Sequence, residues 1–134
     1  MIKAKEVMSK DVLSVKSDAM IIDAIKLLVE NNISGLPVVE DDMSLVGLLS
    51  EKDVVELLYD IERAKSKTVD DYMTHPAVCF EENNALQNVC DFLMRNIFRR
   101  VPITSGGKLV GIISIRDILD YILQLSGEKV GDVS

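Results

Sequence analysis

LVGLLSEKDV at residues 45–54 and LVGIISIRDI at residues 109–118 are two versions of one stretch, 64 residues apart. Two other blocks recur in the same order after 65 residues: VMS at 7–9 returns as YMT at 72–74, and ISGLPV at 33–38 returns as FRRVPI at 98–103. Three matched blocks in constant order identify an internal repeat. The chain is therefore predicted to contain two copies of one structural unit.

Each copy shows the same succession of hydrophobic periods. In the first copy, a β-branched run at 12–15 predicts a strand, and apolar residues at helical spacing predict a helix capped by Ser17 or Asp18. Strands at 36–39 and 45–49 flank a polar turn, and a second helix follows Ser50. The second copy predicts a strand at 78–80, a helix at 86–94, strands at 101–104 and 109–114, and a helix at 115–125.

The expected fold class is α/β (α+β), with two β-α-β-β-α repeats packed with pseudo-twofold symmetry. Neither copy has enough surface to bury its sheet alone, so the two are expected to share one core. We place the first repeat at residues 1–67, with a polar linker at 63–67, and the second repeat at 68–125. The polar tail at 126–134 is expected to fray.

Composition argues against several classes of function. The 134 residues carry a formal charge of −7, contain no tryptophan and are 4% aromatic. Nucleic-acid surfaces need clustered cations or aromatic stacking platforms, so we expect no nucleic-acid partner. No stretch is apolar enough to span a membrane, and the N-terminus lacks a secretory signal, which predicts a cytoplasmic protein with no membrane partner. Cys79 and Cys90 lack metal-ligand spacing and are expected to pack as small hydrophobes.

The order of a short strand, an amphipathic helix, GLPVV at 35–39 and LVGLLSEKD at 45–53 resembles the cystathionine-β-synthase (CBS) domain, which usually occurs in tandem pairs. The resemblance covers residues 5–125 and is closest to stand-alone members of the family. It implies two clefts that bind AMP, ADP, ATP or S-adenosylmethionine as a regulatory ligand, with no required cofactor. It also implies a non-catalytic, energy-sensing homodimer that controls an effector protein of unknown identity.

A Ser-x-x-Asp motif stands at the same place in both copies, as Ser50 with Asp53 and as Ser114 with Asp117. Each motif lies where a strand ends and a helix begins, so a serine hydroxyl and backbone amides there can bind a phosphate, and the aspartate can accept ribose hydroxyls. The spacing also fits a capping box, which is its commoner use. In the CBS family this aspartate binds ribose, so the resemblance favours ribose binding, and one residue can serve both roles.

Arg99 and Arg100 stand where the first copy has Ser34 and Gly35. Two guanidinium groups in an acidic chain can hold a phosphate in bidentate geometry, although a solvated pair of charges at a turn is the ordinary alternative. The resemblance places a basic residue here, facing phosphate. Because Ser34 and Gly35 offer no charge, the two sites are predicted to be unequal.

Carried over position by position, the resemblance predicts two clefts that each combine both repeats. One cleft takes Ser114, Arg116 and Asp117 with Met8, Asp11, Leu13, Ile33 and Ser34. The other takes Ser50, Lys52 and Asp53 with Met73, Pro76, Val78, Phe98 and Arg99. Adenine would lie on aliphatic side chains and be read by strand backbone groups.

No catalytic or metal site is predicted. The single histidine, His75, precedes a proline and is expected in a surface turn, and no nucleophile stands with a plausible base. A structural or dimerisation module with vestigial clefts is the competing function, which the uncharged Ser34 and Gly35 support. An enzyme acting on nucleotides is the third hypothesis, for which the sequence supplies no catalytic groups.

Overall fold

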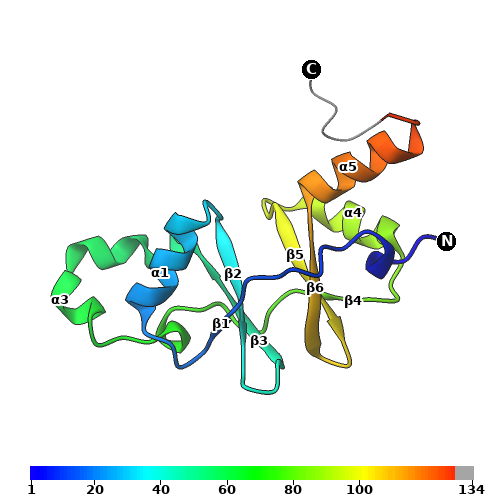
Figure 1. The fold of residues 1–134 in the computed structure, drawn as a ribbon. Coiled ribbons are helices and arrows are strands. Elements are labelled where there is room, and N and C mark those ends of the chain that lie inside the picture. Colours follow the sequence, from blue (N-terminus) through cyan, green and yellow to red (C-terminus); the bar gives the residue numbers. More distant parts are fainter. Residues whose placement is uncertain (129–134) are drawn as a thin grey trace. The chain divides into compact units, whose positions relative to one another are not determined.

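The computed structural model describes residues 1–128 and contains two small sheets, each of three strands (Figure 1). The first sheet has the order β1 (Val15–Lys16), β2 (Gly35–Val39), β3 (Leu45–Ser50). The second has the order β4 (Phe80–Glu81), β5 (Arg100–Ser105), β6 (Lys108–Ser114). The predicted α+β class with a duplicated unit is confirmed.

The helices repeat as well, with one difference between the copies. The first copy has α1 (Ile21–Glu30), followed after β3 by α2 (Glu51–Val54), the 3-10 helix η2 (Val55–Tyr59) and α3 (Ile61–Ala64). The second copy has α4 (Leu86–Arg95) and one continuous helix, α5 (Ile115–Leu125). Two further 3-10 turns are η1 (Ala4–Glu6) and η3 (Val69–Asp71). The predicted second helix of the first copy is therefore broken, and α3 occupies the start of the predicted linker.

Asp60 explains the break in the first copy. Its side chain accepts a hydrogen bond from the Arg63 N–H at 3.1 Å, so it caps α3 and cannot continue η2. The predicted cap of the first helix, Ser17 or Asp18, is wrong. α1 begins after Met20, and the Ser17 hydroxyl instead donates to Glu40 Oε1 at 2.6 Å.

The first strand of each copy is shorter and later than predicted. β1 pairs in parallel with β2 from Val15 opposite Val38, and β4 pairs in parallel with β5 from Phe80 opposite Ile103. Each pairing begins at the residue after a proline, Pro37 or Pro102, which has no N–H to donate to a ladder. Residues 12–14 and 78–79, which the sequence predicts as strand, therefore precede the paired strands.

The chain folds as two compact units that do not follow the sequence repeats. The first-repeat unit contains residues 13–78 and 107–109, and the second-repeat unit contains, of the described residues, 1–12, 79–106 and 110–128. The segment before each repeat thus packs with the sheet of the other repeat. Each unit has its own buried cluster, around Ile21, Leu36 and Leu49 in one and around Ile103 and Ile113 in the other. The core shared between the two repeats stays a prediction.

The two cysteines differ in environment. Cys90 lies on α4, is half-buried and packs against the core of the second-repeat unit, as predicted. Cys79 is exposed, which contradicts the expectation that it packs as a hydrophobe, because it lies just before β4 instead of within the sheet. Part of the tail expected to fray, 129–134, lies outside the described residues.

This difference predicts two rates of thiol modification. Burial, and then the neighbouring Asp91 carboxylate, raises the pKa of the Cys90 thiol, which lowers its thiolate fraction. A time course with dithionitrobenzoate should show one fast and one slow thiol, and Cys79→Ser should remove the fast phase. A single rate for both thiols, or a fast phase that survives Cys79→Ser, would contradict this assignment.

Candidate functional site

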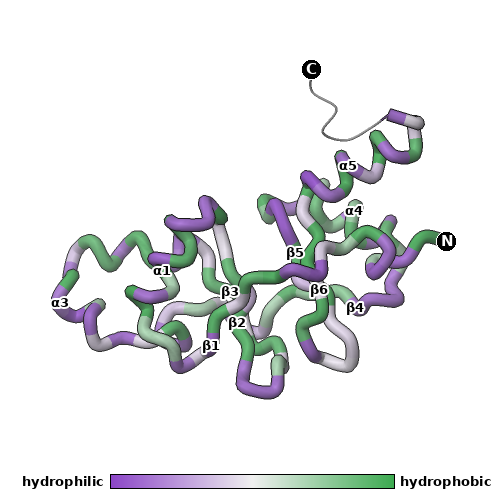
Figure 2. The backbone as a smooth tube through the Cα atoms, in the orientation of Figure 1, coloured by the Kyte–Doolittle hydropathy of each residue, from purple (hydrophilic) through white to green (hydrophobic). Residues whose placement is uncertain are grey.

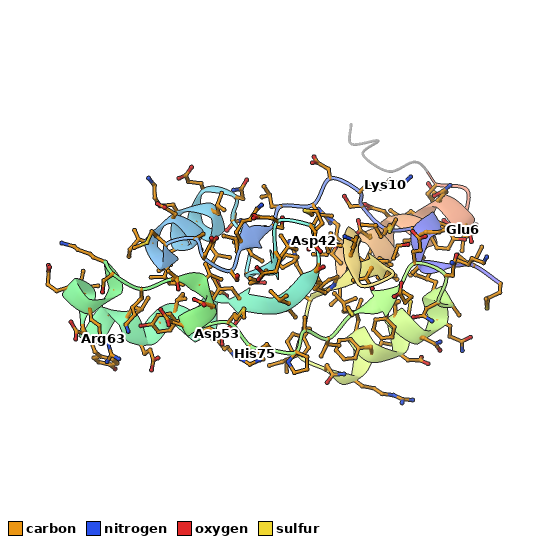
Figure 3. The ribbon with its side chains drawn as sticks, turned by 90° about the horizontal axis from the view of Figure 1, so that it is seen from below. Glu6, Lys10, Asp42, Asp53, Arg63 and His75 are labelled. Carbon is orange, nitrogen blue, oxygen red and sulfur yellow. The ribbon has the colours of Figure 1, made fainter. Side chains whose placement is uncertain are left out.

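The repeated serine and aspartate residues lie at two strand-to-helix corners. Ser50 ends β3 and precedes α2, which we call the first corner; Ser114 ends β6 and precedes α5, which we call the second corner. The two serines, Asp53 and Asp117 are all half-buried. Figure 3 labels Asp53 on the first turn of α2. The predicted positions at the junctions of strand and helix are confirmed.

Both aspartates act as helix caps. At the second corner the Ser114 N–H donates to Asp117 Oδ2 at 2.8 Å, and the Asp117 N–H donates to Ser114 Oγ at 3.1 Å. At the first corner the Ser50 N–H donates to Asp53 Oδ2 at 2.8 Å. There the Ser50 hydroxyl faces the backbone of Asp53 but forms no cap hydrogen bond within the described chain. The capping interpretation is therefore confirmed, and ribose binding stays a prediction.

A third capping box in the chain shows that the motif is not specific to the corners. The Thr68 N–H donates to Asp71 Oδ2 at 2.9 Å at the start of η3, and this hydrogen bond holds the pKa of Asp71 below its usual value. This Thr-x-x-Asp box was not predicted from the sequence. Because neither residue belongs to a predicted cleft, the box provides an internal example of capping alone.

The backbone amides at the corners are largely used by the protein itself. The Glu51 N–H donates to the Ser34 carbonyl at 2.9 Å, and the Ile115 N–H donates to the Arg99 carbonyl at 2.9 Å. Among the amides of residues 114–117, only that of Arg116 has no partner within residues 1–128. At the second corner the expected cluster of free amides is therefore reduced to one, and an anion there would have to be held mainly by side chains.

The capping geometry leaves defined groups for a ligand. In each box the aspartate uses Oδ2, and Oδ1 of Asp53 and of Asp117 accepts no hydrogen bond from the part of the chain that the structure describes. The Ser114 hydroxyl accepts from Asp117 and keeps its own proton to donate. Each corner can therefore offer a carboxylate oxygen and a hydroxyl, which suits the vicinal hydroxyls of a ribose.

Positive charge distinguishes the corners. Arg99 is exposed in the turn before β5, and its carbonyl is hydrogen bonded at the second corner; Arg100 is the first residue of β5, and Arg116 is exposed on α5. None of these arginines forms an ion pair within the described range 1–128. The equivalent position at the first corner is Ser34, and Lys52 is the one cation of α2. The second copy therefore has more basic residues near its corner than the first copy has.

Phe98 is held in place by aromatic packing. Its ring stacks on Phe92 of α4 with centroids 5.8 Å apart and planes 13° apart, and Phe92 meets Phe80 edge-on at 5.7 Å. Phe98 remains 42% exposed, so part of the ring is available to a ligand. The turn formed by Phe98 and Arg99 is therefore fixed at one end by this stack and at the other by the Arg99 carbonyl.

Met8 and Met73 contact the sheets at Gly111 and Gly47, whose role was not predicted from the sequence. Ser9 and Ile112 exchange two backbone hydrogen bonds of 2.9 Å, and Leu48 and Thr74 exchange bonds of 2.9 and 2.8 Å. A Cβ at Gly111 would meet the Met8 thioether and lie 3.0 Å from the Ser9 carbonyl oxygen. At Gly47 it would lie 2.7 Å from Met73 Sδ and 3.0 Å from the Thr74 oxygen. The glycine retained in both copies of LVG was the signal for this close approach.

The units bring part of each predicted cleft together. The second-repeat unit contains Met8, Asp11, Phe98, Arg99, Arg100, Ser114, Arg116 and Asp117. The first-repeat unit contains Leu13, Ile33, Ser34, Ser50, Lys52, Asp53, Met73, Pro76 and Val78. Residues 8 and 11, which are predicted to join the second corner, lie in the same unit as that corner. Residues 73, 76 and 78, which are predicted to join the first corner, lie in the same unit as the first corner. The predicted contributions of Leu13, Ile33 and Ser34 to the second corner, and of Phe98 and Arg99 to the first, stay predictions.

Residues 1–128 contain no group of three or more histidine, cysteine, aspartate or glutamate side chains placed to hold a metal ion. His75 is exposed before Pro76. Over the same described range, none of the helices has the length and apolar character needed to cross a membrane.

Comparison with known proteins places these features in a family. The CBS domain profile matches residues 4–60 and 69–124. The chain is 35% identical over 118 residues to the uncharacterised Methanocaldococcus jannaschii protein MJ1225, covering 88% of this chain but only 42% of that protein. The crystal structure of CBSX2 in complex with AMP matches with a TM-score of 0.84 and 29% identity, covering 94% of this chain and 99% of that one. The CBS domain pair of MJ0100 in complex with methylthioadenosine and S-adenosylmethionine matches with a TM-score of 0.75 and 25% identity, covering 93% and 98%.

Proposed function

Because this chain belongs to the CBS domain family and carries a tandem pair, we propose that it is a non-catalytic, cytoplasmic regulatory module that binds an adenosine-containing ligand. The observation that carries the proposal is the free Oδ1 of the capping aspartate at each corner, next to a serine hydroxyl. CBSX2 binds AMP, and MJ0100 binds methylthioadenosine and S-adenosylmethionine, on the same fold. Ligand occupancy would control an effector protein as an energy signal.

In this proposal both corners bind adenosine-containing ligands, but they differ in the charged groups that contact the phosphate. Asp53 and Asp117 accept ribose hydroxyls through Oδ1 while Oδ2 keeps the cap. Arg99 joins Lys52 in the cleft predicted at the first corner, and Arg116 lies in the cleft predicted at the second corner, where only one amide is free. Guanidinium groups hold phosphate by bidentate hydrogen bonds, so the cleft with more cations available to the ligand favours AMP, ADP or ATP. The cleft with fewer favours an adenosyl ligand of lower negative charge.

Thermal unfolding tests the proposal. AMP, ADP, ATP or S-adenosylmethionine at a hundred times its dissociation constant should stabilise the folded chain by about 2.7 kcal/mol and raise the melting temperature. Adenine without ribose is the matched control, because it lacks the hydroxyls that Asp53 and Asp117 would bind. Calorimetry should then resolve unequal sites. If all four ligands leave the melting temperature unchanged, the proposal is refuted.

A structural module with vestigial clefts is the second candidate. The box formed by Thr68 and Asp71 favours it, because it shows that the same side-chain arrangement serves as a cap with no predicted cleft around it. In that case the corners would only end strands and start helices, and no ligand would shift the melting curve. In either case we propose that the module works as a homodimer.

A further inference from the structure

The end of α4 and the turn that follows it carry an exposed patch, which consists of Met94, Arg95 and Ile97. Met94 and Ile97 are 77% and 82% exposed, and Arg95 is exposed in the last turn of α4. Arg95 forms no ion pair within the described residues 1–128. Figure 2 shows hydrophobic and hydrophilic colour next to each other between α4 and β5. None of the three residues belongs to a predicted cleft, so ligand binding does not account for them.

The first copy lacks this patch at the equivalent place. Its residues there, 65 positions earlier, include Val29, Glu30 and Asn32, and of these only Val29 is apolar, with an exposure of 73%. A cation such as Arg95 suits the negative end of a helix, but α1 ends at Glu30 and forms without one. Because both copies build the same elements, residues that the fold needs are expected in both. Arg95 and Ile97 are therefore not required by the fold of the repeat.

The backbone of this turn is held in place on both sides. The Asn96 N–H and its Nδ2 both donate to the Phe92 carbonyl, at 3.1 and 3.0 Å. The Phe98 ring stacks on Phe92, and the Arg99 carbonyl accepts from the Ile115 N–H. A partner that covers the patch has little backbone motion to arrest, and such preorganisation favours binding.

Charge indicates the kind of partner. Residues 94–100 include three arginines and no acidic residue, in a chain whose formal charge is −7. This local positive charge attracts carboxylates, and the two apolar side chains offer a dry contact beside it. A nucleic acid or an anionic bilayer would extend past the patch and meet the acidic remainder of the chain. The Cα atoms of residues 94 and 97 lie at most about 11 Å apart, so the patch fits a short peptide segment.

We propose that this patch is the docking site for the effector protein, and that the effector binds it through a short acidic segment with apolar side chains. Carboxylates of that segment pair with Arg95, and its apolar side chains cover Met94 and Ile97. The proposal names the chemistry of the effector and rests on the proposed function only for its regulatory meaning. Docking of the segment itself needs no adenosine ligand, so the two proposals can fail separately.

A defined peptide tests the docking site. The probe is a fluorescein-labelled peptide of glutamates interspersed with leucine and phenylalanine, and the same peptide with glutamine in place of glutamate is its control. Fluorescence anisotropy should show saturable binding of the acidic peptide, and added salt should weaken it. Arg95→Glu, and the double variant Met94→Ser/Ile97→Ser, should each weaken binding at least about 10-fold.

Val29→Ser is the matched control variant, because it changes the exposed equivalent of Met94 in the copy that lacks the patch. It should leave the affinity for the peptide at the wild-type value. Urea unfolding should be the same for all these variants, since every substituted side chain is exposed.

Each contrary outcome points elsewhere. The inference is overturned if the acidic peptide does not bind, if the glutamine peptide binds equally well, or if Arg95→Glu leaves the affinity unchanged. Vesicles of phosphatidylserine or an oligonucleotide that bind where the peptide does not would replace the peptide segment by a polyanion. A fall to the monomer mass in Met94→Ser/Ile97→Ser would assign the patch to contact between copies instead. Peptide binding without any shift of melting by AMP, ADP, ATP or S-adenosylmethionine would refute the proposed ligand and support the docking site.

Discussion

Asp117→Asn is expected to weaken AMP binding about 10- to 100-fold while leaving the stability of the free protein nearly unchanged. The asparagine carbonyl can still accept the Ser114 N–H bond, which is 2.8 Å long in the cap. The group that then replaces Oδ1 is an amide NH₂, which donates and cannot accept from a ribose hydroxyl. The substitution therefore removes the proposed ligand contact and keeps the cap. Calorimetric titration with AMP measures the first effect, and urea unfolding measures the second.

Two further variants separate capping from binding. Asp117→Ala removes both functions and should cost about 1 kcal/mol of stability in addition to the loss of affinity. Asp71→Asn makes the same chemical change in the box at η3, outside the predicted clefts, and should leave AMP affinity at the wild-type value. Should Asp117→Asn bind AMP as tightly as the wild type, Asp117 is only a cap and its proposed contact with the ribose is refuted.

The fold could be predicted because its signals are local and occur twice. The LVG-x-x-S-x-x-D blocks place β3 and β6, the hydrophobic spacing places α1 and α4, and all appear in the structure close to their predicted limits. The errors arose where a long-range contact overrides local preference. Ser17 donates to Glu40 and does not cap α1. Pro37 and Pro102 have no N–H to donate, so residues 12–14 and 78–79 do not pair and the parallel ladders begin one residue after each proline.

The residue types of the candidate site could be predicted from the sequence. Which of their oxygen and nitrogen atoms are already hydrogen bonded could not. Sequence spacing identified Ser114 and Asp117 and allowed them to be a cap or a ligand site. Only the folded backbone shows that Oδ2 is occupied, that Oδ1 is free, and that the Ile115 amide is taken by the Arg99 carbonyl. These assignments depend on how the Asp117 carboxylate is turned toward Ser114 and on the contact between residues 99 and 115, neither of which a residue pattern encodes.

Gly111→Ala is expected to destabilise the protein by about 1–3 kcal/mol, as an overpacking substitution. The added methyl group would meet the Met8 thioether and lie 3.0 Å from the Ser9 carbonyl oxygen, which is main chain and cannot rotate away. The Ser9 segment should therefore separate from β6 and weaken its two hydrogen bonds with Ile112. Urea unfolding measures the stability, and amide hydrogen exchange at Ser9 and Ile112 reports the separation directly.

A double-mutant cycle shows which contact causes the loss. Met8→Ala removes the thioether from the path of the new methyl group but leaves the Ser9 oxygen where it is, so Met8→Ala with Gly111→Ala should recover only part of the stability. Full recovery would assign the whole loss of stability to the thioether. Unchanged stability in Gly111→Ala would show that the close approach does not limit the residue at position 111.

Gly47→Ala should behave likewise through Met73 and Thr74. Since Met8 and Asp11 belong to the unit of the second corner, and Met73 to that of the first, Gly111→Ala should weaken ligand binding at Asp117 and Gly47→Ala at Asp53. Gly47 and Gly111 would then link the stability of each sheet to ligand binding at the corner where its last strand ends.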